Sequence, residues 1–275
     1  MERFLTAAGV ALRVRDSGGV EGAPVFVLLH GYLENLEAWD EVAALLKKHA
    51  RVISIDIPGH GLSEVKGEVH AMEMLAAVLK GVLDTLDVNR AFVVGHSMGG
   101  YVALEYLSHY PEGVAGLVLL HSTPNPDTEE KRRQRVREIE VIRSGHKDML
   151  VSSVENAFAA LSRKKMPDAV EQVRVMAELN DGDGIAALLG GMMERRDHND
   201  TLRTSDVPQL LIFGRGDEYL IPEAAQQIVE AHPQAEVVWL ENSGHMGLLE
   251  EPPAVADILL AFSDKHHSKK LSKNI

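Results

Sequence analysis

The chain has 275 residues, of which 45% are hydrophobic and 25% charged, a composition typical of one large globular α/β domain with room for an insertion. The net charge of −13 argues against a surface that binds nucleic acid or an anionic membrane. Because the chain has no cysteine, disulfide bonds, thiolate metal sites and a cysteine nucleophile are all excluded.

The beginning of the chain carries no apolar segment of the length that a secretory signal needs. No later run approaches the length of a membrane span. We therefore expect a cytoplasmic protein that has no membrane partner. Whether it is a monomer or a homodimer is left open.

Apolar-rich runs alternate with helical patterns through the first part of the chain. Residues 3–16 alternate loosely and predict a short antiparallel pair at the edge of a sheet. Runs of strand length, typical of strands buried on both faces, follow at residues 25–29, 51–56, 91–94 and 116–120. Helices are predicted between them at about 36–49, 71–86 and 101–110. This alternation predicts a mostly parallel central sheet with helices on both faces, an α/β fold.

The alternation stops after residue 122 and resumes with strand-like runs at 209–213 and 236–240. The intervening segment has no strand-like run, and helices are predicted there at 128–144, 147–161, 167–180 and 184–195. Its charged run, residues 129–133, is interpreted as a solvated helix face. The sequence thus predicts a core of residues 1–126 and 206–264, a helical cap of residues 127–205 and a polar, frayed tail of residues 265–275. The adjacent histidines of this tail do not indicate a metal site.

The pattern Gly95-x-Ser97-x-Gly99 lies between a strand-like run and a helix-like run. A residue on such a tight strand-to-helix turn adopts a strained backbone, and its neighbours two places away must be nearly free of side chain. The turn lifts the hydroxyl of Ser97 clear of the sheet and places it at a helix N-terminus, where negative charge is favoured. Ser97 is therefore the candidate nucleophile.

A serine nucleophile needs a base, and the base needs an acid that orients it. Asp217 and His245 follow the last two predicted strands, and the carboxyl ends of parallel strands meet at one edge of the sheet. These residues are the candidate acid and base, although each also fits a structural role in its loop. Glu218 is the alternative acid. His96, beside the serine, is interpreted as packing and support.

A negatively charged intermediate needs two N–H donors that are already in place. The backbone N–H of Met98, directly after the nucleophile, is one candidate. The backbone N–H of Tyr32, in the loop after residues 25–29, is the other. Gly31 would let this backbone approach the substrate, and His30 is expected to brace the loop.

Five segments together resemble α/β-hydrolases of the large group of serine hydrolases with a helical cap. The resemblance covers about residues 10–122 and 207–262. The matching segments are His30-Gly31-Tyr32, Asp56-x-Pro58-Gly59-His60-Gly61-x-Ser63, residues 95–100, Gly214-x-x-Asp217 and Gly244-His245. The order nucleophile, acid, histidine along the chain also agrees with this family.

The resemblance implies acyl transfer on a small-molecule acyl substrate. Ser97 would attack a carbonyl, His245 would take its proton, and Asp217 would hold the imidazole. No metal or cofactor is implied. A carboxylic ester is the expected substrate, with thioester or carbon–carbon bond hydrolysis as alternatives, and a receptor-like binding protein with little turnover as the alternative of another class.

The cap is expected to set the choice of substrate. It contains five methionines, which suit an adaptable cavity but are also ordinary core residues. We expect a permissive, mainly apolar cavity for small or medium esters. Its glycines would allow the cap to move or would simply mark helix ends. The residues concerned are Met149, Met166, Met176, Met192, Met193, Gly182, Gly184, Gly190 and Gly191.

Overall fold

The computed structural model describes residues 1–19 and 22–271, with side chains as far as residue 267. Its centre is an eight-stranded sheet in the order β1-β2-β4-β3-β5-β6-β7-β8. The first two strands are antiparallel to each other, β2 is antiparallel to β4, and all other pairs are parallel. The predicted α/β fold and its antiparallel edge are therefore confirmed. The strands are β1 (Glu2–Ala7), β2 (Val10–Asp16), β3 (Val25–Leu29), β4 (Arg51–Ile55), β5 (Ala91–His96), β6 (Val114–Leu120), β7 (Gln209–Gly214) and β8 (Glu236–Leu240).

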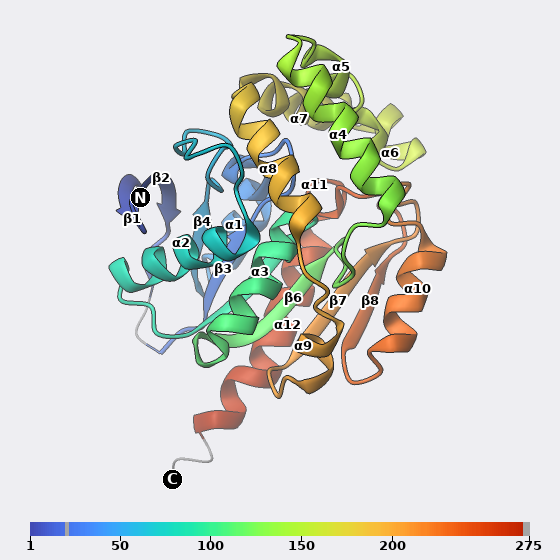
Figure 1. The fold of residues 1–275 in the computed structure, drawn as a ribbon. Coiled ribbons are helices and arrows are strands. Elements are labelled where there is room, and N and C mark those ends of the chain that lie inside the picture. The colour runs from blue at the N-terminus through green and yellow to red at the C-terminus, as the bar shows by residue number, and fades with distance from the viewer. Residues whose placement is uncertain (20–21, 272–275) are drawn as a thin grey trace.

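Helices cover both faces of the sheet (Figure 1). The first and last helices, α1 and α12, pack together on one face, and α2 packs with α3 on the other. The core helices are α1 (Asp40–Leu46), α2 (Met72–Thr85), α3 (Met98–His109), α9 (Asn199–Thr204), α10 (Pro222–Ala231), α11 (Gly247–Glu250) and α12 (Pro252–Leu271), with short 3-10 turns η1 (Leu36–Trp39) and η2 (Pro111–Gly113).

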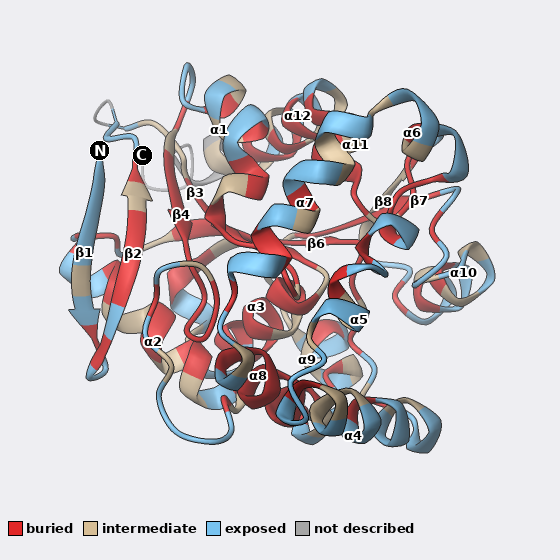
Figure 2. Ribbon diagram, turned by 90° about the horizontal axis from the view of Figure 1, so that it is seen from above, coloured by how far each residue is buried: buried red, intermediate tan, exposed pale blue. Residues whose placement is uncertain are grey.

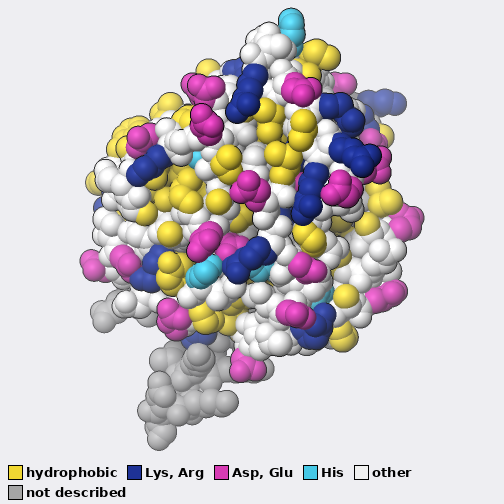
Figure 3. All heavy atoms as spheres, viewed as in Figure 1, with side chains coloured by type: hydrophobic (Ala, Val, Ile, Leu, Met, Phe, Trp, Pro, Cys, Tyr) yellow, Lys and Arg dark blue, Asp and Glu magenta, His cyan; other side chains and the backbone are white. Residues whose placement is uncertain are grey.

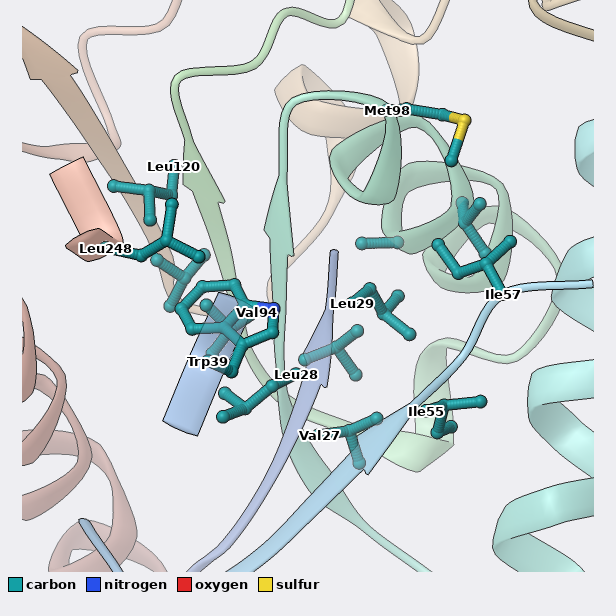
Figure 4. Close-up of a cluster of buried hydrophobic side chains, with 14 of the residues drawn as sticks. Val27, Leu28, Leu29, Trp39, Ile55, Ile57, Val94, Met98, Leu120 and Leu248 are labelled. Carbon is teal, nitrogen blue, oxygen red and sulfur yellow. The ribbon is translucent and has the colours of Figure 1, made fainter. Parts of the chain in front are cut away.

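The middle strands are buried on both faces, which is why their sequences are continuously apolar (Figure 2). Figure 4 shows Trp39 and Leu248 on one side of these strands and Ile57 and Met98 on the other. All four side chains are buried. The nucleophile turn after β5 therefore stands on a rigid two-sided core.

Between β6 and β7 the chain forms helices and no strand within the described residues. Helices α4 to α8 gather beyond the carboxyl ends of the parallel strands, and this layer is the cap. By contrast, α9 contacts α3 of the core, so the part of the insertion that forms the cap ends before α9 (Figure 1). The cap elements are α4 (Glu129–Arg143), α5 (Asp148–Val151), η3 (Val154–Ala157), α6 (Ala160–Lys165), α7 (Pro167–Leu179) and α8 (Gly182–Glu194).

Two local predictions are wrong. The single helix expected at 147–161 is broken into α5, η3 and the start of α6, because extended backbone at Phe158 carries this fully buried side chain inward. The tail is not frayed from residue 265, because α12 continues to Leu271 and both Lys265 and His266 contact the Glu236 carboxylate, at 2.9 and 2.7 Å. The rest of that predicted tail, residues 272–275, lies outside the described residues.

The glycines of α8 bring the cap into contact with the core backbone. A Cβ at Gly191 would lie 1.8 Å from the carbonyl oxygen of His70, and one at Gly184 would lie 2.1 Å from that of Gly59. The N–H of His70 also donates to the carbonyl of Ala187 at 2.9 Å. Gly184 and Gly191 therefore allow close packing of α8 on the core backbone, a role that the sequence did not suggest. Gly184 also lies in the first turn of α8, which agrees with the expected role at a helix end.

Candidate active site

The turn after β5 has the strained geometry that its sequence predicts. Ser97 has φ 48°, the left-handed region that a residue with a side chain rarely adopts. A Cβ at Gly95 would lie 2.4 Å from the N of Gly100, and one at Gly99 would lie 2.4 Å from the carbonyl oxygen of Leu29. Small residues on both sides are therefore a condition for closing the turn.

Ser97, His245 and Asp217 form one hydrogen-bonded chain. His245 Nε2 lies 2.8 Å from Ser97 Oγ, and His245 Nδ1 lies 2.8 Å from Asp217 Oδ2. The loops that follow β5, β7 and β8 supply these residues, which is the strand-end arrangement expected from the sequence. The structure thus brings the candidate nucleophile, base and acid together, in reach of proton transfer.

The Asp217 carboxylate is held in place on both oxygens. Its Oδ1 accepts from the N–H groups of Tyr219 and Leu220, at 2.8 and 2.9 Å, while Oδ2 faces His245. Burial would raise the pKa of Asp217, but the neighbouring His245 and His121 outweigh it and hold that pKa well below its usual range. The carboxylate is therefore ionised. The alternative acid, Glu218, instead binds Arg163 at 2.7 Å.

His96 supports the site from behind. Its Nδ1 lies 2.9 Å from Glu34 Oε1, and its Nε2 donates to the carbonyl oxygen of His245 at 2.7 Å. Burial opposes the charge on His96, but Glu34 raises its pKa. Gly31 leaves the space for this pair, since a Cβ there would lie 2.5 Å from Glu34 Oε1 and 2.8 Å from His96 Nδ1. The sequence did not single out Glu34, which looks like any acidic loop residue.

The loop after β3 is braced by two stacked histidines. His30 Nε2 accepts from the N–H of Ile57 at 2.9 Å, and His60 Nε2 accepts from the N–H of Leu33 at 2.9 Å. The His30 and His60 rings stack with centroids 5.9 Å apart. His30 thus contacts backbone and packs, as expected, and these contacts hold the backbone on either side of Tyr32.

Two backbone N–H groups near Ser97 are candidates for binding an oxyanion. Met98 is the first residue of α3, a position whose N–H has no partner inside the helix. The N–H of Tyr32 donates to no acceptor among residues 1–19 and 22–271. Leu33 beside it has φ 65°, so this loop is strained as well. The assignment of Tyr32 and Met98 as the two donors stays a prediction.

His121 is a site neighbour that sequence reasoning missed. It directly follows β6, is fully buried, and has φ 49°. Its Nδ1 lies 3.2 Å from Asp217 Oδ2, although neither ring nitrogen makes a well-aligned hydrogen bond to a described residue. Burial lowers the pKa of His121 to about 4, so the ring is neutral near pH 7. The same strand-end rule that found Asp217 and His245 could have found it.

The buried neutral histidines predict a loss of stability in mild acid. The pKa of His60 is lowered to about 3 and that of His121 to about 4, in both cases mainly by burial. Below pH 6.5 the unfolded chain binds protons at these positions and the folded chain does not, so each costs about 2 kcal/mol of stability between pH 7.5 and pH 5. His96, whose pKa is raised, acts in the opposite direction. We expect the thermal midpoint to fall across this range, and less steeply in His60→Gln; a midpoint that stays level with pH would contradict this.

Hydrogen bonds connect the cap to the loop that carries His245, the candidate base. The N–H of His245 donates to the carbonyl of Ala157 at 2.7 Å. The N–H of Ala159 donates to Glu250, whose other carboxylate oxygen accepts from the N–H of Gly244 at 2.8 Å. Residues 157–159 of the cap and the loop that carries His245 are therefore one hydrogen-bonded unit.

The site opens into a cavity of about 350 Å³ between core and cap. Its apolar lining includes Leu33, Leu150, Val154, Val173 and Met192. The α4 side is polar, with Lys131, Gln134, Arg135 and Glu138. On the outer surface, Figure 3 shows basic side chains interspersed with acidic ones in the region of this helix.

Apolar surface makes up the larger part of the cavity lining, as expected, but the polar side at α4 was not expected. One face of α4, which the sequence presented as a solvated charged helix, faces the substrate space. Of the five cap methionines only Met192 lines the cavity, while Met176 is core and Met149 is 61% exposed. Met192 thus fits the expected role in the cavity, and Met176 fits the alternative of an ordinary core residue.

Within the described ranges, the cluster His121, Asp217 and His245 has the donor atoms of a metal site, all within 4.8 Å of one another. Two of these residues already hold the proton path to Ser97. A metal bound there would displace that path.

The chain matches known proteins along most of its length. Residues 24–140 match the model of the alpha/beta hydrolase fold. The chain is 30% identical to the dihydrolipoyllysine-residue acetyltransferase component of an acetoin cleaving system from Pseudomonas putida, over 94% of this chain and 68% of that protein. It is 29% identical to a 2-hydroxy-6-oxononadienedioate/2-hydroxy-6-oxononatrienedioate hydrolase from Paraburkholderia phymatum, over 92% of each.

Among solved structures, the malate-bound thermophilic esterase from Thermogutta terrifontis superposes with a TM-score of 0.91 and 27% identity, over 97% of this chain and 99% of that one. None of the helices between residues 1 and 271 that the structure describes is long and apolar enough to cross a bilayer. The sheet order, the strained serine turn and these similarities agree, and the chain belongs to the α/β-hydrolase family.

Proposed function

We propose that this protein hydrolyses carboxylic esters of small acids through an acyl-enzyme on Ser97. The observation that carries the proposal is the continuous chain from Ser97 Oγ through His245 to Asp217, with 2.8 Å at each step, at the floor of a cavity. The esterase from Thermogutta terrifontis, similar over nearly the whole chain, supports the same chemistry.

The reaction follows from the positions of these groups. Ser97 Oγ attacks the ester carbonyl while its proton passes to His245 Nε2. The N–H groups of Tyr32 and Met98 stabilise the oxyanion, and Asp217 stabilises the imidazolium. His245 then gives the proton to the departing alcohol. Water attacks the acyl-enzyme with His245 again as base, and the acid is released, so no metal or cofactor is required.

The size of the cavity favours small substrates. A volume of about 350 Å³ is near the lower end of ligand sites. Long acyl chains, such as those of lipids, do not fit inside it without opening the cap. We therefore place small and medium acids ahead of fatty acids as the acyl part.

Carbon–carbon bond hydrolysis is the second candidate on the same three residues. The similarity to the Paraburkholderia phymatum hydrolase, over 92% of both chains, is the observation that favours it. Thioester hydrolysis uses the same acyl-enzyme and is the remaining alternative. A screen of esters, thioesters and diketones under one set of conditions separates the three.

The proposal predicts that a fluorophosphonate probe labels the wild-type protein and not Ser97→Ala. The probe reacts with a serine whose proton has a nearby base, which is the arrangement at Ser97 and His245. Labelling is measured by intact mass, and ester turnover is measured beside it. Ser122→Ala is the matched control, because Ser122 lines the same cavity but binds the carbonyl oxygen of Ser97 through its hydroxyl.

An unlabelled wild type would contradict the enzyme proposal and favour the receptor-like alternative. Equal labelling of Ser97→Ala would show that the reactive serine lies elsewhere. Labelling without turnover of any ester would favour carbon–carbon bond hydrolysis, provided that a diketone is cleaved.

A further inference from the structure

The cap side of the cavity carries charges that the proposed ester chemistry does not use. Lys131, Arg135 and Glu138 lie on one face of α4, at the spacing of successive helix turns, and all line the cavity. Arg135 binds the Asp127 carboxylate, with Nε to Oδ2 at 2.5 Å, and Arg195 binds the same carboxylate. Asp127 and both of these arginines are buried.

These charges do not cancel. The Asp127 carboxylate faces two guanidinium groups, and Lys131 forms no ion pair within the described part of the chain. Lys131 Nζ donates instead to Gln134 Oε1 at 3.2 Å, and Gln134 donates to Glu138 at 2.8 Å. Glu34 also lines the cavity, but its carboxylate is paired with His96 behind the site, at 2.9 Å. Apart from that pair, the α4 end holds three cations, Lys131, Arg135 and Arg195, against the two carboxylates of Asp127 and Glu138, which is one more cation than carboxylate. Burial and the neighbouring Arg135 lower the pKa of Lys131, as expected for an ammonium that lacks a counter-ion.

A second, independent feature lies at the same end of the cavity. The hydroxyl of Tyr32 is buried and has no hydrogen-bond partner among the described residues. Tyr32 lines the same cavity as Lys131, Arg135 and Glu138. Burial raises the pKa of its phenol, so the hydroxyl keeps its proton and can donate it. A buried hydroxyl without a partner destabilises the free protein, and an acceptor on a bound ligand removes this cost.

We infer that the acyl part of the substrate carries a carboxylate, which lies between Lys131 and the Tyr32 hydroxyl while the ester carbonyl lies at Ser97. The substrate class is then a half-ester of a small dicarboxylic acid. The inference rests on the proposed function, because it uses the cavity that adjoins Ser97. A single surplus positive charge suits a carboxylate better than a dianion such as phosphate, because Glu138 lines the cavity beside Lys131 and would repel a second negative charge.

The test compares charged and neutral substrates of the same shape. The substrates are the monomethyl esters of succinic, glutaric and adipic acid, and the matching methyl esters in which the free acid is the primary amide. At the chain length that spans the cavity, we expect kcat/KM for the acid to exceed that for its amide 10- to 100-fold, the usual effect of a charge-assisted hydrogen bond.

Two variants test whether the preference for the acid over the amide depends on Lys131 and the Tyr32 hydroxyl. Lys131→Met and Tyr32→Phe are each expected to reduce the ratio of acid to amide about tenfold. Arg133→Met is the matched control, because Arg133 lies on the same helix but is 76% exposed and faces away from the cavity. Its acid-to-amide ratio should equal that of the wild type.

Substrate binding to the variant Ser97→Ala, which lacks the nucleophile, tests the inference independently of turnover. Calorimetric titration of this variant with the glutarate half-ester and its amide should show tighter binding of the acid. Equal binding, or tighter binding of the amide, overturns the inference. If the wild type cleaves neutral esters without preferring the acid, this inference fails and the proposed function stands. If the acid binds preferentially but no ester is cleaved, the proposed function fails and the charge preference stands.

Discussion

Replacement of Asp217 by Asn is expected to lower kcat for ester hydrolysis about 10⁴-fold while the protein stays folded. Oδ1 of Asp217 accepts two backbone N–H groups, so the amide oxygen of Asn takes that place and its NH₂ faces His245. The imidazole must then accept at Nδ1 and carry its proton on Nε2. In that tautomer it cannot take the proton of Ser97. Initial rates on a p-nitrophenyl ester measure the loss.

Glu218→Gln is the control for this prediction. Glu218 is the neighbouring carboxylate and was the alternative acid, but it binds Arg163 at 2.7 Å on the surface. We expect kcat within about twofold of the wild type, because an exposed ion pair contributes little. Comparable losses in the two variants would contradict the assignment of Asp217.

Gly99→Ala is expected to lower the free energy of unfolding by about 4 kcal/mol and the thermal midpoint by about 10 °C. A Cβ there would lie 2.4 Å from the carbonyl oxygen of Leu29 and 2.7 Å from that of His30. Both carbonyl oxygens belong to the backbone at the end of β3, which cannot shift as a side chain can. The whole of α3 must therefore move away from the strand. Chemical denaturation measures the change, and activity should fall with it because Ser97 precedes α3.

Gly182→Ala provides the comparison on another helix. An added Cβ there meets only the end of the Ile142 side chain, at 3.3 Å, which can shift. We expect a change within about 1 kcal/mol of the wild type. A small effect of Gly99→Ala would mean that the turn relaxes without strain.

The core of the site could be predicted because its residues follow from local rules. Strands buried on both faces are readable as apolar runs, and the ends of parallel strands converge on one edge. Ser97, Asp217 and His245 each follow such a run, so their meeting required no knowledge of distances. His121 obeys the same rule, and it was missed because a histidine after a strand has no motif around it.

The cap could not be predicted to the same depth. Periodicity places α4, but a charged helix has no apolar stripe to show which face is covered. Lys131 and Arg135 become site residues only through the packing of α4 above the sheet, which depends on distant contacts. The broken helix near Phe158 has the same cause, since one buried aromatic side chain overrides the local helical pattern.

The hydrogen bonds between residues 157–159 and the His245 loop have a practical consequence for protein engineering. A cap taken from another family member and joined at the obvious boundaries, after β6 and before β7, would bring a foreign partner for the N–H of His245. Chimeras should therefore transplant the cap together with residues 243–250 as one module. A library of chimeras that exchanges the cap alone would disturb the position of His245 at the same time as it changes the substrate specificity.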